Sequence, residues 1–158
     1  ERDSGTFSYA AHACIVAIDT EIGEVEILDY VIIEDGGVLI NPMVVDGQVY
    51  GGTAQGLGTA LYEEMVYDEN GQPLSTTLGD YLLPSAVEMP PIRIDHMETP
   101  SPYTRFGQKG LGEGGAIGPP AAIANAINDA LKDLGVTVDR LPMAPARLFE
   151  LIRAAGGK

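Results

Sequence analysis

The sequence predicts a chain of the α/β class, in finer terms α+β, with an N-terminal β-hairpin, further short mixed strands and about three packed helices. Two observations lead to this class. Apolar, strand-like segments come first, at residues 7–19 and 25–33, joined by a short turn. Segments with helical periodicity or helix-starting prolines follow at residues 45–65, 119–134 and 145–154.

Composition suits a single domain over residues 1–158 and argues against two kinds of partner. The chain is 45% hydrophobic, which is enough for a core, and no apolar run approaches the roughly 20 residues of a membrane span. Asp and Glu number 23 against 9 Lys and Arg, a net charge of −14, whereas nucleic acids and anionic membranes attract clustered positive charge. The single cysteine, Cys14, excludes an internal disulfide and a cysteine-based metal site, and its apolar neighbours predict a small core residue.

The strands are predicted from alternation and turn residues. Gly23 suits the left-handed position of the hairpin turn. In the second strand, alternation places four apolar side chains on one face, namely Val25, Ile27, Val31 and Ile33. Residues 30–33 are continuously apolar, so both faces are expected to be covered there. Residues 92–97 alternate as a strand does, and residues 136–138 are expected to form another short strand.

The first predicted helix, residues 45–65, contains glycines that break the usual rule for helices. Apolar residues recur there at three- and four-residue steps. The same segment holds four glycines, each costing a helix roughly 0.8–1 kcal/mol relative to alanine: Gly51, Gly52, Gly56 and Gly58. Such violations mark functional sites or very close packing, so we expect the start of this helix to face a ligand.

Two further helices are predicted near the C-terminus. The first is expected to begin at Pro119 or Pro120, because proline suits the first helical turn. It should end near Leu134, with Gly135 as its C-terminal cap. Residues 145–154, which begin with a proline, are expected to form the last helix.

One acidic residue stands out in the glycine-rich segment before the second helix. Glu113 lies between Gly112 and Gly114, whose lack of side-chain bulk lets a large ligand approach its carboxylate. A carboxylate in a water-poor pocket has a raised pKa and can take a proton near neutral pH, which is the task of a general base. We therefore interpret Glu113 as a catalytic base beside a large organic metal cofactor. The alternative is a solvent-exposed loop glutamate.

Gln48 is the second candidate site residue. Its carboxamide both donates and accepts hydrogen bonds, which suits the edge of a heterocycle; the alternative is a polar residue at a helix start. His12 and His96 stand alone in the sequence and are interpreted as core or surface histidines rather than metal ligands. The glycine clusters match neither a dinucleotide-binding unit nor a phosphate-binding loop, because the required strand, acidic residue and Gly-Lys-Ser/Thr sequence are missing around them.

Three blocks of sequence, taken together and in this order, resemble one known family. The blocks are INP at 40–42 with GQVYGGTAQGLG at 47–58 and LYEE at 61–64, then DYLLP at 80–84, then KGLGEGG at 109–115 with PPAAIANA at 119–126. They are similar to the C-terminal portion of the molybdopterin-binding large subunit of the molybdenum hydroxylases, the xanthine dehydrogenase/aldehyde oxidase family. The order and spacing most resemble the branch of aerobic carbon monoxide dehydrogenase. The resemblance covers nearly the whole chain.

This resemblance implies roles for residues at matching positions. It implies a molybdenum-dependent oxidoreductase that oxidises an aldehyde, an N-heterocycle or carbon monoxide with metal-bound oxygen. Glu113 would be the catalytic general base that deprotonates a metal-bound hydroxyl, and Gln48 a hydrogen-bond partner of the pterin. No residue is implied as a metal ligand. The residues implied to bind the cofactor are Gln48, Gly51, Gly52, Lys109, Gly110 and Gly112.

The resemblance also implies cofactors and partners. The cofactor would be molybdenum-molybdopterin, with a cytosine dinucleotide form as one option, and iron–sulfur centres and FAD would lie on partner domains or subunits. The chain would be the last part of a longer, cytoplasmic catalytic subunit, inactive alone, with the remainder of that subunit, iron–sulfur and FAD subunits and a small-molecule substrate as partners. We then expect uncovered apolar surface, which a homodimer would be one way to hide. Two alternatives are a separately encoded subunit and a non-catalytic assembly or interaction module.

Overall fold

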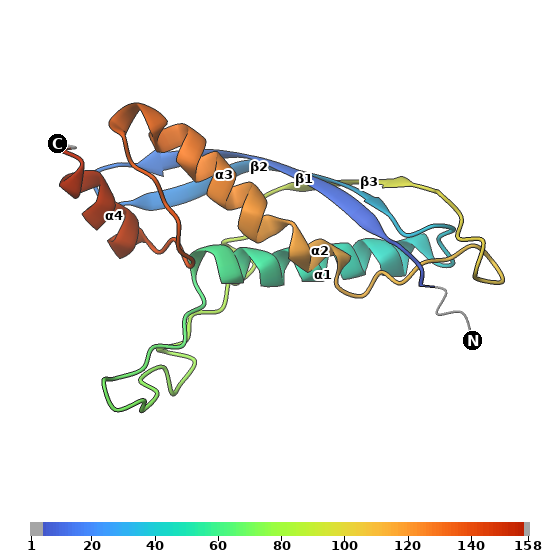
Figure 1. The fold of residues 1–158 in the computed structure, drawn as a ribbon, viewed down its shortest axis with the longest axis horizontal. Helices are drawn as coiled ribbons and strands as arrows, with labels where there is room; N and C mark the ends of the chain where they lie inside the picture. The colour runs from blue at the N-terminus through green and yellow to red at the C-terminus, as the bar shows by residue number, and fades with distance from the viewer. Residues whose placement is uncertain (1–4, 157–158) are drawn as a thin grey trace.

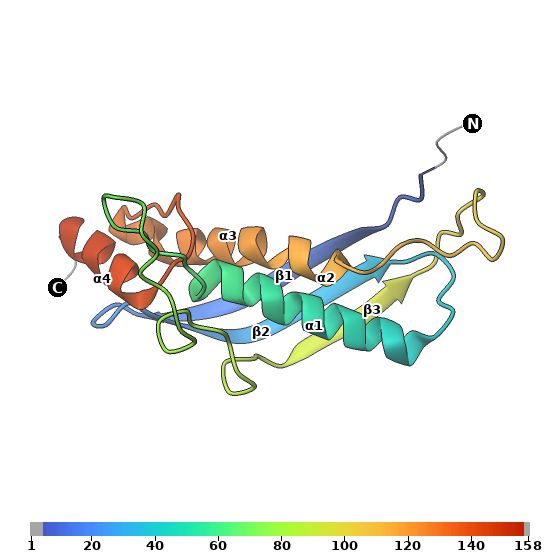
Figure 2. The same cartoon turned by 90° about the horizontal axis from the view of Figure 1, so that it is seen from below.

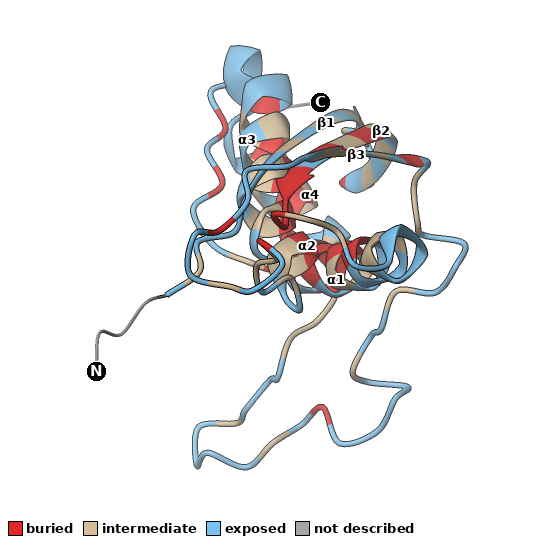
Figure 3. Cartoon of the chain, turned by 90° about the vertical axis from the view of Figure 1, so that its right-hand side faces the viewer, coloured by how far each residue is buried: buried red, intermediate tan, exposed pale blue. Residues whose placement is uncertain are grey.

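A computed structural model describes residues 5–156 of the chain. One three-stranded sheet carries all of its helices on one face, and the other face is open to solvent (Figures 1 and 3). The predicted α+β class is confirmed. The elements in chain order are β1 (Tyr9–Asp19), β2 (Glu24–Asp35), α1 (Pro42–Leu61), β3 (Ile92–Met97), α2 (Gly114–Ile117), α3 (Pro119–Leu131), the 3-10 helix η1 (Lys132–Leu134) and α4 (Pro145–Ala154).

The strands are ordered β1-β2-β3, so β2 is central. β1 and β2 form the predicted antiparallel hairpin, with Gly23 at φ 75° in the turn, and β3 pairs with β2 in parallel. The pairing shifts between Ile15 and Val16, which leaves Leu28 of β2 without a partner. Such a bulge reverses which face the following side chains occupy. Our assignment of Val31 and Ile33 to the face of Val25 and Ile27 is therefore wrong: beyond the bulge, the inward residues are Tyr30, Ile32 and Glu34.

Helix α1 lies along the inner face of the sheet (Figure 2) and begins earlier than predicted. The Asn41 side chain caps its start by accepting a hydrogen bond from the Val44 N–H at 3.3 Å, and Pro42 occupies the first helical position. The helix ends at Leu61, four residues before the predicted end. There the backbone N–H groups of residues 62 and 63 both donate to the Gly58 carbonyl. The prediction of a helix over residues 45–65 is thus right in kind and displaced at both ends.

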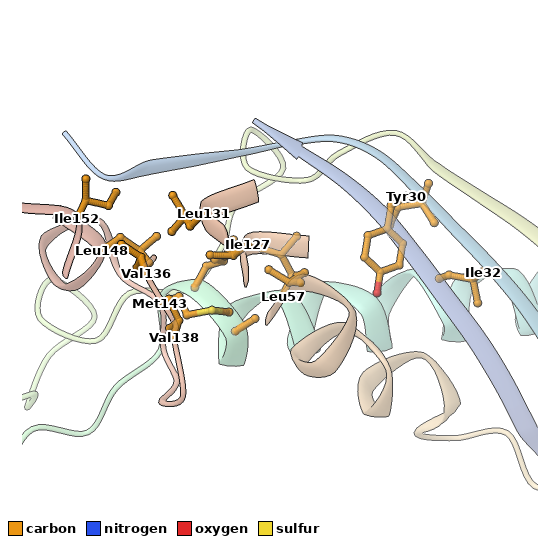
Figure 4. Packing of buried hydrophobic residues seen from close by; sticks show 14 of the residues in the cluster. Tyr30, Ile32, Leu57, Ile127, Leu131, Val136, Val138, Met143, Leu148 and Ile152 are labelled. Carbon is orange, nitrogen blue, oxygen red and sulfur yellow. The ribbon is translucent and has the colours of Figure 1, made fainter. Parts of the chain in front are cut away.

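The core lies between the sheet and α1, α3 and α4 (Figure 4). Ile123, Ile127 and Leu131 recur on the inward face of α3 and are almost completely buried. Each such side chain contributes about 1.5–3 kcal/mol by leaving water. Cys14 packs at the edge of this core, as predicted, and burial raises the pKa of its thiol.

The short strand predicted at residues 136–138 does not form. Val136 and Val138 are buried, yet their backbone joins no sheet within the described part of the chain. Instead, the Asn128 carboxamide on α3 accepts from the Val138 N–H at 2.7 Å and donates to its carbonyl at 2.9 Å. One side chain thus satisfies the backbone groups that a neighbouring strand would otherwise pair. The predicted helices at residues 119–134 and 145–154 are confirmed, and Gly135 caps the first at φ 68°.

The segment between α1 and β3, residues 62–91, projects away from the body of the molecule (Figures 1 and 3). We call it the arm. Several of its large apolar side chains are solvent-exposed, among them Leu78 and Val87, which are 76% and 88% exposed. Apolar surface of this kind was expected from the sequence. No helix within residues 5–156 combines the length and apolarity needed to cross a bilayer.

Candidate functional site

Gln48 and the segment that carries Glu113 are neighbours in the structure, although 64 residues separate Gln48 from Gly112. The Gln48 Nε2 group, on the exposed side of α1, donates a hydrogen bond to the Gly112 carbonyl at 2.8 Å. Deeper in the same contact, a Cβ atom on Gly52 would lie 2.9 Å from the Ala116 backbone nitrogen. The close approach of α1 and α2 therefore depends on glycine and fixes Glu113 next to the start of α1.

The glycines around this contact fall into two groups. Gly52, Gly56 and Gly115 meet backbone atoms so closely that a side chain would clash. A second group has open space where a Cβ atom would stand, is solvent-exposed, and is not held at positive φ: Gly47, Gly51, Gly110 and Gly112. We call this second group, together with Gln48, the open glycine face.

Packing among residues 5–156 does not explain the open glycine face. Gly47 and Gly51 lie inside α1, where each costs the helix about 0.8–1 kcal/mol relative to alanine. Nothing within 4 Å would oppose a methyl group at either position. A surface of bare backbone, bordered by one carboxamide, suits a broad ligand that must approach the main chain closely. This arrangement meets the requirement that an organic cofactor would impose.

Glu113 occupies the N-cap position of α2, and its carbonyl accepts a hydrogen bond from the Ala116 N–H at 3.0 Å. Helix α2 is a single turn, so Glu113 lies between the glycine loop and the start of α3. Its side chain is solvent-exposed. The water-poor surroundings expected from the sequence are not formed by residues 5–156 and would have to come from outside them.

Lys109 anchors the loop that leads to Glu113. Its Nζ atom lies 3.0 Å from Oδ1 of Asp35, at the end of β2, and 2.6 Å from the Thr99 hydroxyl oxygen. Burial alone would raise the pKa of Asp35, but hydrogen bonds from Thr99, Gly37 and Lys109 outweigh it and hold that pKa well below its usual range. The Asp35 side chain is completely buried and that of Lys109 is 7% exposed. The ammonium group of Lys109 is thus already paired with Asp35 and Thr99, so any contact of Lys109 with a cofactor would involve its backbone.

The structure places the predicted cofactor-binding residues at two depths. Gln48, Gly51, Gly110 and Gly112 belong to the open glycine face, whereas Gly52 lies beneath it against α2. Sequence reasoning missed Asp35. The available signal was a pair of acidic residues after an apolar run and before two glycines, and its partner Lys109 is 74 residues away.

Comparison with known proteins gives this arrangement a family. The sequence profile of the molybdopterin cofactor-binding domain matches residues 1–90. The chain belongs to this family. It is 43% identical over 151 residues to the large subunit of nicotine 6-hydroxylase from Paenarthrobacter nicotinovorans, an alignment that covers 96% of this chain and 18% of the relative. The resemblance inferred from the three sequence blocks is confirmed at the level of the family.

Solved structures agree with this family assignment. Quinoline 2-oxidoreductase from Pseudomonas putida 86 has a TM-score of 0.87 and 47% identity, covering 90% of this chain and 18% of that one. Reconstituted CO dehydrogenase from Oligotropha carboxidovorans has a TM-score of 0.92 and 35% identity, covering 96% and 19%. The chain therefore spans less than a fifth of the length of these relatives.

Proposed function

We propose that this domain forms part of a molybdenum hydroxylase, with the open glycine face holding the molybdopterin and Glu113 acting as the general base. One observation carries the proposal: the Gln48–Gly112 hydrogen bond joins the glycine face to the residue directly before Glu113. A ligand lying on bare backbone at Gly51 and Gly112 would thus be beside that carboxylate. When bound, the molybdenum cofactor supplies the two-electron oxidation chemistry that side chains lack.

Gln48 contributes orientation. One N–H of its carboxamide is engaged by Gly112, which fixes the plane of the group. The carbonyl oxygen and the second N–H then remain available as an acceptor and a donor side by side. This pair matches the edge of a pterin ring, and Gly47 and Gly51 keep the adjacent helix surface free of side chains.

Glu113 contributes proton transfer. In the assembled enzyme, the remainder of the large subunit would cover its carboxylate and exclude water, which strengthens electrostatic interactions at the site. Gly112 has open space where a side chain would stand, so a planar substrate has room to approach the carboxylate from that side. Two of the relatives named above are called after nicotine and quinoline. Since both are N-heterocycles, we favour an N-heterocyclic substrate over an aldehyde or carbon monoxide.

The wider assembly belongs to the same proposal. Electrons would leave through iron–sulfur centres and FAD on partner domains or subunits, in a cytoplasmic enzyme. The cytosine dinucleotide form of the pterin and a homodimer are part of this expectation. The exposed apolar residues of the arm, such as Leu78 and Val87, would be covered by the remainder of the large subunit.

A second candidate is a non-catalytic assembly module, favoured by that same exposed arm. Substitution of Glu113 by Gln in the full-length enzyme separates the two candidates. We expect kcat to fall by about 10²–10⁴-fold, the usual contribution of a positioned general base, while molybdenum content stays at the wild-type level. Glu150→Gln, an exposed change on α4, is the matched control and should leave kcat unchanged. Equal turnover in Glu113→Gln and the control would reject the catalytic role and favour the assembly module.

A further inference from the structure

A cavity lies behind the turn that follows Glu113. Its volume is about 230 Å³, room for several water molecules at ~30 Å³ each. Glu34 and His12 line it from the sheet, and Gly114 and Gly118 from the opposite side. A Cβ atom on Gly114 would lie 1.7 Å from Oε1 of Glu34, and one on Gly118 would lie 2.2 Å from the His12 ring. The two glycines therefore make room for two polar side chains that the sequence had not marked as a pair.

Glu34 is buried without a hydrogen-bond partner. It is 1% exposed, and neither carboxyl oxygen is hydrogen-bonded to any group within residues 5–156. Burial raises the pKa of Glu34, and the nearby His96 only partly opposes this effect. An isolated buried carboxylate is costly, and such a group takes up a proton instead. Burial without a partner therefore favours the protonated, acid form of Glu34, which lies against Gly114, the residue that follows Glu113.

A path leads from Glu34 to the surface. Because β2 and β3 are parallel, with Glu34 opposite His96, the two side chains are neighbours on the inner face of the sheet. The His96 Nδ1 atom is buried and has no hydrogen-bond partner in the described chain, while Nε2 lies 2.8 Å from Oδ1 of Asp46 on α1. The Asp46 side chain is 50% exposed. In the tautomer of His96 that is protonated on Nε2, this nitrogen donates to Asp46 and Nδ1 presents a lone pair toward the interior.

We propose that Glu34, His96 and Asp46 form a proton relay that carries the proton taken up by Glu113 away to solvent. This inference rests on the role proposed for Glu113. Glu34 gives its proton to His96 Nδ1, the imidazolium loses its Nε2 proton to Asp46, and Asp46 releases it to bulk water. Protonated Glu113 then restores the acid form of Glu34 through water in the cavity. One proton enters and one leaves, and the imidazole then carries its proton on Nδ1; rotation of the ring turns that N–H toward Asp46 for the next cycle.

Other titratable groups face this path without continuing it. His12 donates to or accepts from the Tyr30 hydroxyl at 3.1 Å, and burial lowers the pKa of His12, so it stays neutral beside the cavity. Burial likewise raises the pKa of the Tyr30 hydroxyl well above its usual range, so this group keeps its proton. The Asp35–Lys109 ion pair lies next to Glu34 in sequence but is closed on itself. Along this path, Asp46 is the half-exposed carboxylate that contacts His96.

Infrared spectroscopy and kinetics of the full-length holoenzyme test the relay. The carbonyl stretch of a protonated carboxylic acid should be present at neutral pH and absent in Glu34→Gln. It should persist in Glu26→Gln, an exposed change on the same strand, and in His96→Gln, which interrupts the path without touching the acid. Both Glu34→Gln and His96→Gln should lower kcat about tenfold or more, part of the ~10²–10⁴-fold that positioned proton transfer contributes, with KM unchanged.

Each negative result contradicts a different step of the argument. If the wild-type band is missing at neutral pH, Glu34 is ionised and the relay is wrong. If the band is present but both path variants turn over like Glu26→Gln, Glu34 is a buried acid that carries no proton to the surface, and the relay is again wrong. Full turnover in Glu113→Gln would instead remove the proposed base, while the infrared assignment of Glu34 would remain valid. Should Glu34→Gln fail to fold, His96→Gln and the wild-type spectrum still decide the question.

Discussion

Gly51 and Gly52 are adjacent in α1 but face different surroundings, and alanine at each position should have opposite consequences. Both substitutions remove a helical glycine, so both gain about 0.8–1 kcal/mol of helix propensity. At Gly51 the new methyl group meets nothing within 4 Å. At Gly52 it would lie 2.9–3.1 Å from three backbone atoms of residues 115 and 116, which cannot rotate away.

The difference between the two variants therefore isolates the contact of α1 with α2. Overpacking of this kind costs about 1–3 kcal/mol, so Gly52→Ala should be less stable than Gly51→Ala by that amount. Thermal unfolding of the purified chain measures it, since about 2–4 °C in Tm corresponds to each kcal/mol in a chain of roughly this size. Gly51→Ala should equal or exceed the wild type in Tm.

The same pair of variants tests the open glycine face in the full-length enzyme. The Gly51→Ala methyl group stands on the surface assigned to the cofactor, so this variant should lose molybdenum despite its unimpaired stability. Its molybdenum content, measured by elemental analysis, is compared with that of the wild type. A Gly51→Ala enzyme with full molybdenum loading would refute the reasoning about the face. A Gly52→Ala chain as stable as Gly51→Ala would refute the packing argument.

Two further predictions concern stability. Asp35→Asn leaves the buried Lys109 unpaired and should lower the free energy of unfolding by about 3–5 kcal/mol. Asp129→Asn, in an exposed ion pair, should lower it by about 0–1 kcal/mol. Denaturant titration compares the two variants. Because the pKa of Asp35 is lowered in the folded state, ionised Asp35 stabilises the fold above pH ~3.9, the pKa of an unfolded aspartate, and this stabilisation is lost as the pH falls below that value. Unfolding measured over a pH series should show this loss in the wild type and not in Asp35→Asn. Asn128→Ala removes the partner of both backbone groups of Val138 and should cost about 1–3 kcal/mol in the same titration. Asn125→Ala, on the exposed side of α3, should cost far less, and equal losses in the two would contradict this role of Asn128.

Local signals predicted most of the secondary structure. Alternation found β3 at its observed bounds, and proline at a first helical turn found the starts of α3 and α4. Local signals failed where a distant group changed the outcome. The bulge at Leu28 reversed the inward face of β2, and the Asn128 side chain took the place of the strand neighbour that Val138 lacks. Neither the pairing register of a hairpin nor the reach of a side chain from another helix is written in the local pattern.

The candidate site was foreseen in its residues and not in its arrangement. The sequence alone indicated that the glycines of α1 needed a reason, since every one weakens the helix, and that Glu113 stood free of neighbouring bulk. It also carried enough of the family's blocks for the molybdopterin cofactor-binding domain to be recognised. The catalytic role of Glu113 and the cofactor contacts of Gln48 stay predictions, with the experiments above as their tests.

Only the tertiary structure separated the glycines that permit close packing, such as Gly52, from those that leave backbone bare, such as Gly51. It also paired the ammonium group of Lys109 with Asp35 and buried Glu34 beside His96. The physical reason is common to all these cases. Composition and periodicity report which groups are present and how they are spaced along one segment. Burial, ion pairing and free space are properties of segments far apart in the chain, and they are decided only when those segments meet.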